Sequence, residues 1–361
     1  MSLTPITADQ ALLRLDEFDT LIDARSEDEF AEDHLPGALN WPTLNNEQRI
    51  LIGTTYKQVN AFEAKKRGAA LAARNIASHI ERELLDKAKD WKPLNYCWRG
   101  GKRSGSLSLV LDQIGFKVSI IEGGYKAFRA ALVHDTIRLT NSLQFRVVCG
   151  TTGSGKTRLL QALSQAGAQV LDLEALASHR SSVLGAIPGQ TQPSQKRFDT
   201  LVWGRLRSFD SARPVYVESE SKKVGNVAVP LSLIDAMRAS PCLNLNLAEP
   251  QRVALLLEDY AFFIHDKDLF CHKLDALTQA RGGEVVKRWK DSVHSDQIEV
   301  VVRELLSLHY DPVYLQSMQR NFSQFSKAQQ LQAKDRSTQA MLRLALEILQ
   351  SASGLRRNVA A

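Results

Sequence analysis

The amino-acid sequence predicts two consecutive α/β domains, each built on a parallel sheet, followed by a helical C-terminal region. Three observations support this fold class. Short apolar runs alternate with helical segments through the first half of the chain, and a second strand–loop–helix unit begins near Ser142. After Glu249 the pattern is mostly helical. With 361 residues the chain is long enough for two domains, which we expect at 1–137 and 138–361.

Elements of the first domain follow from local signals. Ser26 and Glu29 form a capping box that opens a short helix. Gly115 stands where it would end the helix that begins at Ser104. The stretch 56–89 is rich in Ala, Glu and Lys and has no internal proline, so we expect it to be helical, within a helical insert at about 45–90. The expected strands are 20–24, 38–40, 94–96 and 118–121, and the expected helices are 26–31, 56–89, 104–114 and 125–133.

The second domain starts with an apolar strand at 145–149, which leads into a glycine-rich loop and a helix at 156–166. We expect long amphipathic helices at 253–263 and 298–308. Further expected strands are 168–171, 214–217 and 242–247.

Composition is typical of a folded globular protein, with 44% hydrophobic residues and mixed charge. No segment approaches the ~20 apolar residues of a membrane span, and residues 1–10 lack the pattern of a secretory signal. The four cysteines are widely spaced and show no zinc-binding spacing. Their scarcity fits a reducing compartment, so we expect a cytoplasmic protein. We also expect the protein to be a monomer.

A net charge of +6 and a pI near 9.1 favour a polyanionic partner. The excess charge is spread over clusters that are each typical of a solvated surface. Together with a phosphate-binding loop, they indicate nucleic acid as a candidate partner. The clusters are 65–67, Lys222 with Lys223, Lys287 and Arg288 with Lys290, and Arg356 with Arg357.

Cys97 opens a glycine-rich loop between an expected strand and an expected helix. A thiolate is favoured near positive charge and near a helix N-terminus. Backbone N–H groups in such a loop would bind an oxyanion or stabilise a charged sulfur or selenium adduct. We therefore predict that Cys97 is catalytic, with a buried structural cysteine as the alternative. The expected supporting residues are Arg99, Gly100, Gly101, Lys102, Arg103 and Ser104.

Residues 21–42, 96–104 and 115–128 together resemble a rhodanese domain read from end to end. In that family the loop cysteine carries sulfur as a persulfide, so the resemblance places the carrier at Cys97. Asp33 departs from the glycine that is usual before His34. Family positions that mainly shape the fold are matched by Asp23, Arg25, Glu29, His34 and Gly37.

The spacing from Cys97 to Arg103 is C-x5-R, one residue longer than in many single-domain sulfurtransferases. Cysteine-dependent phosphatases use the same spacing, and their arginine clamps the phosphate. A wider loop should admit a larger anion than sulfane sulfur. A phosphatase or a plain sulfurtransferase, fused to a nucleotide-binding module, is therefore an alternative function.

Residues 150–157 fit the phosphate-loop pattern G-x-x-x-x-G-K-[ST], between a strand and a helix. Lys156 would meet terminal phosphate oxygens, and Thr157 could ligate Mg²⁺, although no metal site is certain. The strand end at Glu218 and Glu220 is not a typical Asp-ended Walker B strand, which argues against ordinary NTP hydrolysis. The expected phosphate-binding residues are Gly150, Gly153, Ser154, Gly155, Lys156 and Thr157.

A rhodanese domain followed by a phosphate loop resembles the tRNA 2-selenouridine synthase family, and the match covers nearly the whole chain. It extends to residues 45–58, 172–185 and 215–225. The second of these carries a distinctive D-L-E-x-x-A-x-H-R element, with Ser181 where the family usually has glycine. A second, acidic site is predicted from Asp172, Glu174, His179, Arg180, Glu218 and Glu220.

The family resemblance implies conversion of 2-thiouridine to 2-selenouridine at the wobble position of tRNAs for Lys, Glu and Gln. The implied co-substrates are selenophosphate and geranyl diphosphate, with no tightly bound cofactor and an S-geranyl intermediate. Cys97 would then carry selenium, and the phosphate loop would hold the diphosphate. A prenyl pocket could include Tyr260, Phe262 and Phe263, which an ordinary helical core also explains. A nucleotide-switched RNA-binding protein with a vestigial rhodanese domain is the non-enzymatic alternative.

Overall fold

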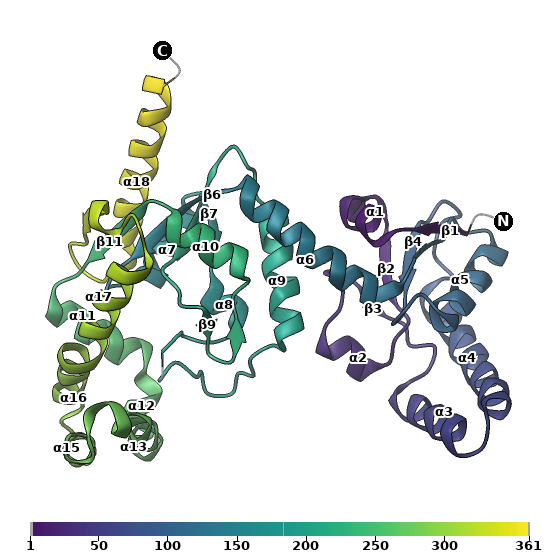
Figure 1. The fold of residues 1–361 in the computed structure, drawn as a ribbon, viewed down its shortest axis with the longest axis horizontal. Helices are drawn as coiled ribbons and strands as arrows, with labels where there is room; N and C mark the ends of the chain where they lie inside the picture. Colours follow the sequence, from purple (N-terminus) through teal and green to yellow (C-terminus); the bar gives the residue numbers. More distant parts are fainter. Residues whose placement is uncertain (1–2, 183, 360–361) are drawn as a thin grey trace. The chain divides into compact units, whose positions relative to one another are not determined.

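The computed structural model describes residues 3–182 and 184–359 and confirms the predicted fold class (Figure 1). Residue contacts divide the chain into two compact units. The first comprises Met1–Arg138 and Pro193–Gly204, and the second comprises Leu139–Gln192 and Arg205–Ala361. The return of 193–204 to the first unit had no signal in the sequence, because the contacts that create it join residues far apart along the chain.

The first unit contains a five-stranded parallel sheet with the order β1-β5-β4-β2-β3. Apolar runs form its central strands, as predicted, and β1 was missed because Pro5 stands at its centre, where proline does not indicate a strand. The strands are β1 (Thr4–Ile6), β2 (Thr20–Asp23), β3 (Leu39–Asn40), β4 (Pro93–Tyr96) and β5 (Ser119–Ile121). The helices are α1 (Ala8–Leu13), η1 (Leu15–Glu17), α2 (Glu27–Glu32), α3 (Asn46–Gln58), α4 (Ala61–Glu83), α5 (Lys102–Ile114) and α6 (Gly124–Ser142).

Two expected helices of this unit have different bounds in the structure. The stretch predicted to be helical at 56–89 is covered by two helices that end earlier, because α3 ends at Gln58, and α4 begins at Ala61 and ends at Glu83. Asn60 separates them, since its side chain accepts a hydrogen bond from Glu63 N–H (2.8 Å) and caps the new helix. Helix α6 is longer than the predicted 125–133, because no glycine or proline interrupts it.

Helix α9 (Gln195–Arg207) supplies the returning segment of the first unit. Asp199 accepts a hydrogen bond from Arg129 Nη2 (2.6 Å). Trp203 Nε1 donates to Asp135 (2.8 Å). Both contacts are partly shielded from water, so they hold the segment more firmly than exposed ion pairs would.

The second unit contains a parallel sheet with the order β12-β11-β6-β8-β7, whose apolar face packs against α7 and α18 (Figure 1). Strand β12 was missed because its sequence is glutamine-rich, with Leu331 as its single buried residue. The strands are β6 (Gln144–Cys149), β7 (Gln169–Leu171), β8 (Pro214–Glu218), β11 (Cys242–Asn246) and β12 (Gln329–Gln332), beside an antiparallel pair, β9 (Lys223–Val224) and β10 (Val227–Ala228). The helices around them are α7 (Lys156–Gln165), α8 (Leu173–Ala177), α10 (Leu231–Ala239) and α18 (Thr338–Val359).

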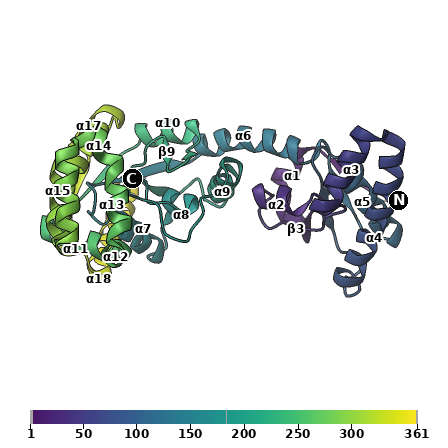
Figure 2. The same cartoon turned by 90° about the horizontal axis from the view of Figure 1, so that it is seen from below.

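Figure 2 shows the helical region of the second unit. This region forms its own apolar core, which includes the buried Trp289 and Phe270. The helix expected at 253–263 is broken at Tyr260, between α11 and α12. No helix in the described ranges is both long and apolar enough to span a membrane. The helices are α11 (Glu249–Asp259), α12 (Ala261–His265), α13 (Lys267–Leu274), η2 (Asp275–Leu277), α14 (Thr278–Arg281), α15 (Gly283–His294), α16 (Ile298–Glu304), the π-helical η3 (Leu305–Tyr310), α17 (Asp311–Asn321) and η4 (Phe325–Lys327).

Candidate functional site

Cys97 follows β4 directly, and its loop ends at the first residue of α5, Lys102. Two donors are aimed at the sulfur: Gly101 N–H at 3.2 Å and the Ser104 hydroxyl at 3.1 Å from Cys97 Sγ. The residue is only 2% exposed, so these hydrogen bonds act in a shielded environment. Donors in this position stabilise negative charge on the sulfur or on an atom bound to it.

The shape of the cysteine loop depends on its close approach to the first turn of α6. Tyr125 N–H donates to Cys97 O (2.8 Å), and Lys126 N–H donates to Trp98 O (3.0 Å). Gly124 has φ +58°, and a Cβ there would come closer than 3.0 Å to Cys97 O and Gly100 N. The approach therefore requires glycine at position 124, and the first turn of α6 fixes the loop.

The three basic residues of the loop lie in different places. Arg99 and Lys102 are exposed. Arg103 donates to the Glu29 carboxylate (2.6 Å), which also accepts from Ser26 N–H (3.3 Å) in the predicted capping box. Burial opposes the charge of Glu29, but the guanidinium of Arg103 outweighs it and lowers the pKa of the carboxyl group. The Arg103 guanidinium is thus held in an ion pair with Glu29. In a phosphatase the same guanidinium would have to bind the phosphate.

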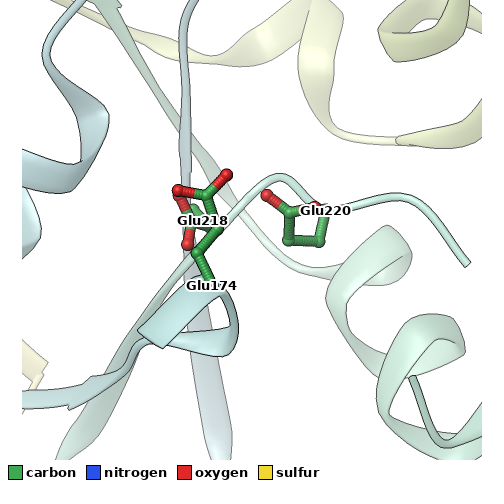
Figure 3. A group of neighbouring side chains, drawn as sticks. All are labelled: Glu174, Glu218 and Glu220. Carbon is green, nitrogen blue, oxygen red and sulfur yellow. The ribbon is translucent and has the colours of Figure 1, made fainter. Parts of the chain in front are cut away.

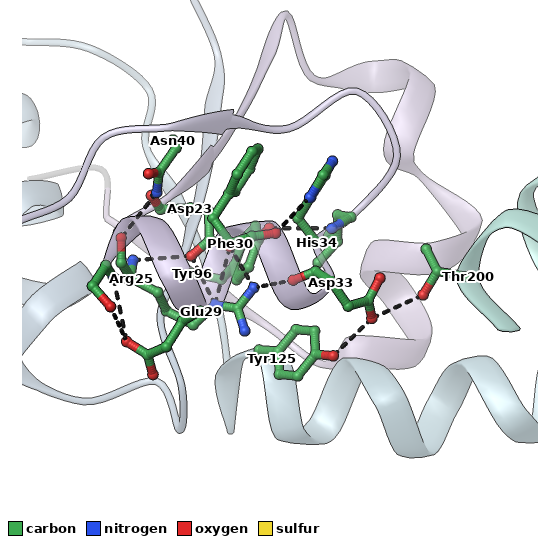
Figure 4. Close-up of polar contacts among 12 residues, drawn as sticks. Asp23, Arg25, Glu29, Phe30, Asp33, His34, Asn40, Tyr96, Tyr125 and Thr200 are labelled. Carbon is green, nitrogen blue, oxygen red and sulfur yellow. Dashed lines mark hydrogen bonds and ion pairs between the residues drawn. The ribbon is translucent and has the colours of Figure 1, made fainter. Parts of the chain in front are cut away.

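The family-matching residues of the first unit form a buried polar network (Figure 4). Arg25 Nη2 donates to Asp23 (2.6 Å) and to Asp33 O (2.6 Å). The Asp33 carboxylate accepts from Tyr125 OH (2.7 Å) and Thr200 OH (3.0 Å), and burial raises its pKa. Arg25 Nη1 and Asp33 Oδ1 are buried without a hydrogen-bond partner in the described part of the chain, but the other polar atoms named here pair with one another, as expected for residues that shape the fold.

The phosphate loop runs from the end of β6 to the start of α7. Gly150, Gly153 and Gly155 all have positive φ, at +154°, +76° and +91°. At Gly150 a Cβ would lie 2.7 Å from Leu245 O, so only glycine fits. Lys156 Nζ donates to Gly150 O (2.7 Å), and the buried Ser154 hydroxyl has no partner within the described part of the chain. The unpartnered Ser154 hydroxyl and the positive charge of Lys156 fit an anionic group bound at the loop. Thr157 is half-buried at the start of α7.

Tyr314 and Arg252 also hold the phosphate loop, and no local pattern in the sequence indicated either residue. The Tyr314 hydroxyl accepts from Gly150 N–H (2.7 Å) and is hydrogen-bonded to the Ser219 hydroxyl (3.0 Å). Arg252 donates from Nη2 to Thr152 O (2.8 Å) and pairs with Asp311 (2.6 Å). Both belong to the helical region, which therefore completes the loop's support.

Three of the predicted acidic residues come together: the carboxylate oxygens of Glu174, Glu218 and Glu220 lie within 4.8 Å of one another (Figure 3). Burial raises the pKa of each, and repulsion between the carboxylates adds to the shift for Glu174 and Glu218. The pKa of Glu174 rises to about 8. The ammonium of Lys156 acts in the opposite direction on all three carboxyl groups.

The other residues of the predicted second site have separate roles. Asp172 caps α8 by accepting from Ala175 N–H (2.8 Å), and burial raises its pKa. His179 pairs in a β-bridge with Ala186, and its Nδ1 is buried without a partner in the described ranges. Arg180 donates to Asp259 O and lies over the Tyr260 ring, 4.7 Å from its centroid.

An apolar cavity opens beside the phosphate loop. Its volume is about 60 Å³, and Thr152 of the loop forms part of its wall. Phe263 lines the cavity. It also belongs to the apolar core of the helical region, which is the ordinary core role that the sequence also allowed. Ser182, Leu184, Leu256, Tyr260, Phe270, Val302, Leu305, Leu306 and Tyr310 complete the lining.

The predicted basic clusters lie on helices of both units, except for Lys222 and Lys223, which lie at the start of β9. Residues 65–67 and Lys222 with Lys223 are exposed. Arg288 and Lys290 are each paired with an acidic residue, Glu304 and Asp275. The side chains of Arg356 and Arg357 lie outside the described residues.

Comparison with known proteins assigns both parts of the chain. The rhodanese-like domain model matches residues 7–131, and the model described as the tRNA 2-selenouridine synthase AAA domain matches residues 143–282. The chain is 30% identical to a tRNA 2-selenouridine synthase from Nitrosomonas europaea over 345 residues, covering 83% of this chain and 89% of that one. It is 32% identical to another of that name from Marinobacter nauticus over 343 residues, covering 87% and 92%. A solved rhodanese-related protein from Thermoplasma volcanium is 17% identical, with a TM-score of 0.23 over 35% of this chain and 89% of that one. That structural similarity is too low to carry an argument.

Proposed function

Since this chain belongs to the tRNA 2-selenouridine synthase family, we propose that it replaces the sulfur of 2-thiouridine with selenium at the wobble position of tRNA. The proposed route has two steps: geranylation of the sulfur by geranyl diphosphate, then displacement of the geranylthio group by selenium from selenophosphate. The chain is then a transferase that acts on tRNAs for Lys, Glu and Gln, as a monomer in the cytoplasm.

One observation carries the geranyl step: a phosphate loop and an apolar cavity share a wall residue, Thr152. A prenyl diphosphate has the matching pattern, an anionic head joined to an apolar tail. Lys156 and the unpartnered Ser154 hydroxyl would meet the head, and the cavity side chains would meet the tail. The cavity of about 60 Å³ holds roughly four to six water-sized groups. A ten-carbon chain would therefore require some of its lining to move.

In the geranyl step the uridine sulfur attacks the first carbon of the prenyl chain. The carbon–oxygen bond to diphosphate breaks, and diphosphate leaves with the electron pair. The charge that develops on the leaving group favours donors placed around it, and the loop amides with Lys156 are such donors. The strand end at Glu218 and Glu220 is not a typical Asp-ended Walker B strand, in keeping with diphosphate binding without NTP hydrolysis.

In the selenium step Cys97 and its loop would hold the selenium that selenophosphate supplies. Water attacks phosphorus, the phosphorus–selenium bond breaks with its electron pair left on selenium, and phosphate is released. At the uridine carbon, the resulting selenide donates an electron pair and geranylthiolate leaves with the pair of the broken carbon–sulfur bond, so the step needs no oxidant. Gly101 N–H and the Ser104 hydroxyl support this role, because they would stabilise negative charge on the selenium held beside Cys97. A thiol in every assay keeps Cys97 reduced.

The test of the prenyl site fills the cavity from one side. Val302 lines the cavity from α16, and Val300 on the same helix is 47% exposed and does not line it. We expect Val302→Trp to exclude part of the geranyl chain. Losing three buried CH2 groups, at about 0.8 kcal/mol each, weakens binding roughly fifty-fold.

Calorimetry with geranyl diphosphate and with inorganic pyrophosphate provides the measurement. Val302→Trp should weaken the first and leave the second within about twofold, and Val300→Trp should change neither. An unchanged affinity of Val302→Trp for geranyl diphosphate would remove the cavity from the prenyl site.

A further inference from the structure

The Glu174, Glu218 and Glu220 cluster lies at the carboxyl edge of the sheet, next to the phosphate loop. Glu218 is the last residue of β8, and it pairs in register with Val148 of β6, two residues before Gly150. The following residue, Ser219, donates from its N–H to Val148 O (3.0 Å). Glu174 lies in the first turn of α8, and Glu220 follows Glu218 directly after β8, so two chain segments bring three carboxylates to one point.

The second observation is an unsatisfied oxygen inside this cluster. Glu218 is only 1% exposed, and its Oε1 has no hydrogen-bond partner anywhere in residues 3–182 and 184–359. In Figure 3 its carboxylate faces that of Glu174, with Glu220 beside them. A buried carboxylate oxygen without a donor is costly, so the folded protein needs either a proton or a cation there.

Charge leads to the same choice. Three carboxylates within 4.8 Å repel one another strongly when ionised and buried. Burial raises the pKa of all three groups, and repulsion from neighbouring carboxylates adds to the shift for Glu174 and Glu218. Lys156 is the basic side chain that acts on all three, and it also serves the phosphate loop. One ammonium leaves the cluster under-neutralised.

We propose that Glu174, Glu218 and Glu220 bind a divalent cation of the Mg²⁺ class beside the phosphate loop. The ligand set is entirely carboxylate oxygen, which suits Mg²⁺, Ca²⁺ or Mn²⁺ rather than Zn²⁺ or Cu²⁺. Mg²⁺ takes one or two carboxylates together with phosphate oxygens and water. The inference rests on the proposed function only in that the donor's diphosphate would supply those phosphate oxygens.

This assignment differs from the site expected at Thr157, because it places the cation's protein ligands on α8 and after β8. Ser181, which donates to Glu220, would orient that carboxylate. Asp172 is excluded from the ligand set, because its carboxylate caps α8.

The experiment uses Mn²⁺ as a paramagnetic probe on the full-length protein. Electron paramagnetic resonance counts the Mn²⁺ bound per chain, with and without inorganic pyrophosphate. The variant is Glu218→Gln, which keeps the side-chain shape, and the matched control is Glu284→Gln, at an exposed position of α15. Circular dichroism confirms that both variants are folded, and Glu220→Gln replaces Glu218→Gln if the latter is not.

We expect about one Mn²⁺ per wild-type chain, bound more tightly in the presence of pyrophosphate. Glu218→Gln should weaken Mn²⁺ binding at least tenfold, and Glu284→Gln should leave it unchanged. Wild-type protein that binds no Mn²⁺ at millimolar concentration, or a folded Glu218→Gln variant with unchanged affinity, would overturn the proposal.

The outcome is independent of the geranyl chemistry. Mn²⁺ binding in a protein that ignores geranyl diphosphate would support the cation site and contradict the proposed function. Full geranylation by a protein that binds no Mn²⁺ would support the function and overturn the cation site.

Discussion

The contact between the cysteine loop and the first turn of α6 makes the structure sensitive to substitution at Gly124. Replacing Gly124 with alanine places a Cβ against Cys97 O and Gly100 N, both of which are main-chain atoms that cannot rotate away. The loop must therefore move away from the first turn of α6. That movement breaks the hydrogen bond from Tyr125 N–H to Cys97 O, and it shifts the donors that face the sulfur.

The magnitude follows from two parts. An L-residue in the left-handed conformation costs about 1–2 kcal/mol relative to glycine. Losing a shielded backbone hydrogen bond costs about 1–3 kcal/mol more. Gly37→Ala is the matched control, because Gly37 has φ +76° but no described atom within 4 Å of its Cβ. The difference between the two variants should therefore be about 1–3 kcal/mol.

Thermal unfolding measures this difference. In a unit of about 150 residues, 1 kcal/mol shifts Tm by about 2–4 °C, so Gly124→Ala should unfold about 2–12 °C below Gly37→Ala. We expect Gly124→Ala to lose selenation and to retain geranylation. If Gly124→Ala matches Gly37→Ala in Tm and still selenates, the loop does not depend on this contact.

The remaining predictions separate the two steps. Cys97→Ser should accumulate geranylated tRNA and lose selenation, read by mass spectrometry of the nucleosides, and full selenation in this variant would exclude the carrier role. Lys156→Met removes a charged donor worth about 1.5–3 kcal/mol, so calorimetry should show geranyl diphosphate binding about 10- to 150-fold weaker. Unchanged affinity would take Lys156 out of the phosphate site.

Local signals in the sequence were enough to predict most strands of the two five-stranded sheets, and the positions of the cysteine loop and the phosphate loop. The capping box at Ser26 and the left-handed Gly115 at the end of α5 are both present, because each depends on residues a few positions apart. The break at Asn60 shows the limit of composition, since one capping side chain divides a stretch that otherwise favours a single helix.

The features that the sequence did not predict depend on contacts between distant residues. Tyr314 meets Gly150 across 164 positions, and no local pattern marks it. Glu174 and Glu218 were both candidates, but their spacing along the chain did not show that they share one buried cluster with Glu220. The cavity has the same origin, because α11, α12, α13, α16 and η3 each contribute to its wall.

The two-step route can be tested in a single reaction. Purified protein is incubated with 2-thiouridine tRNA, geranyl diphosphate and a thiol, with and without selenophosphate, and the wobble nucleoside is identified by mass. We predict S-geranyl-2-thiouridine without selenophosphate and 2-selenouridine with it. Full conversion to 2-selenouridine in the absence of geranyl diphosphate would contradict the account.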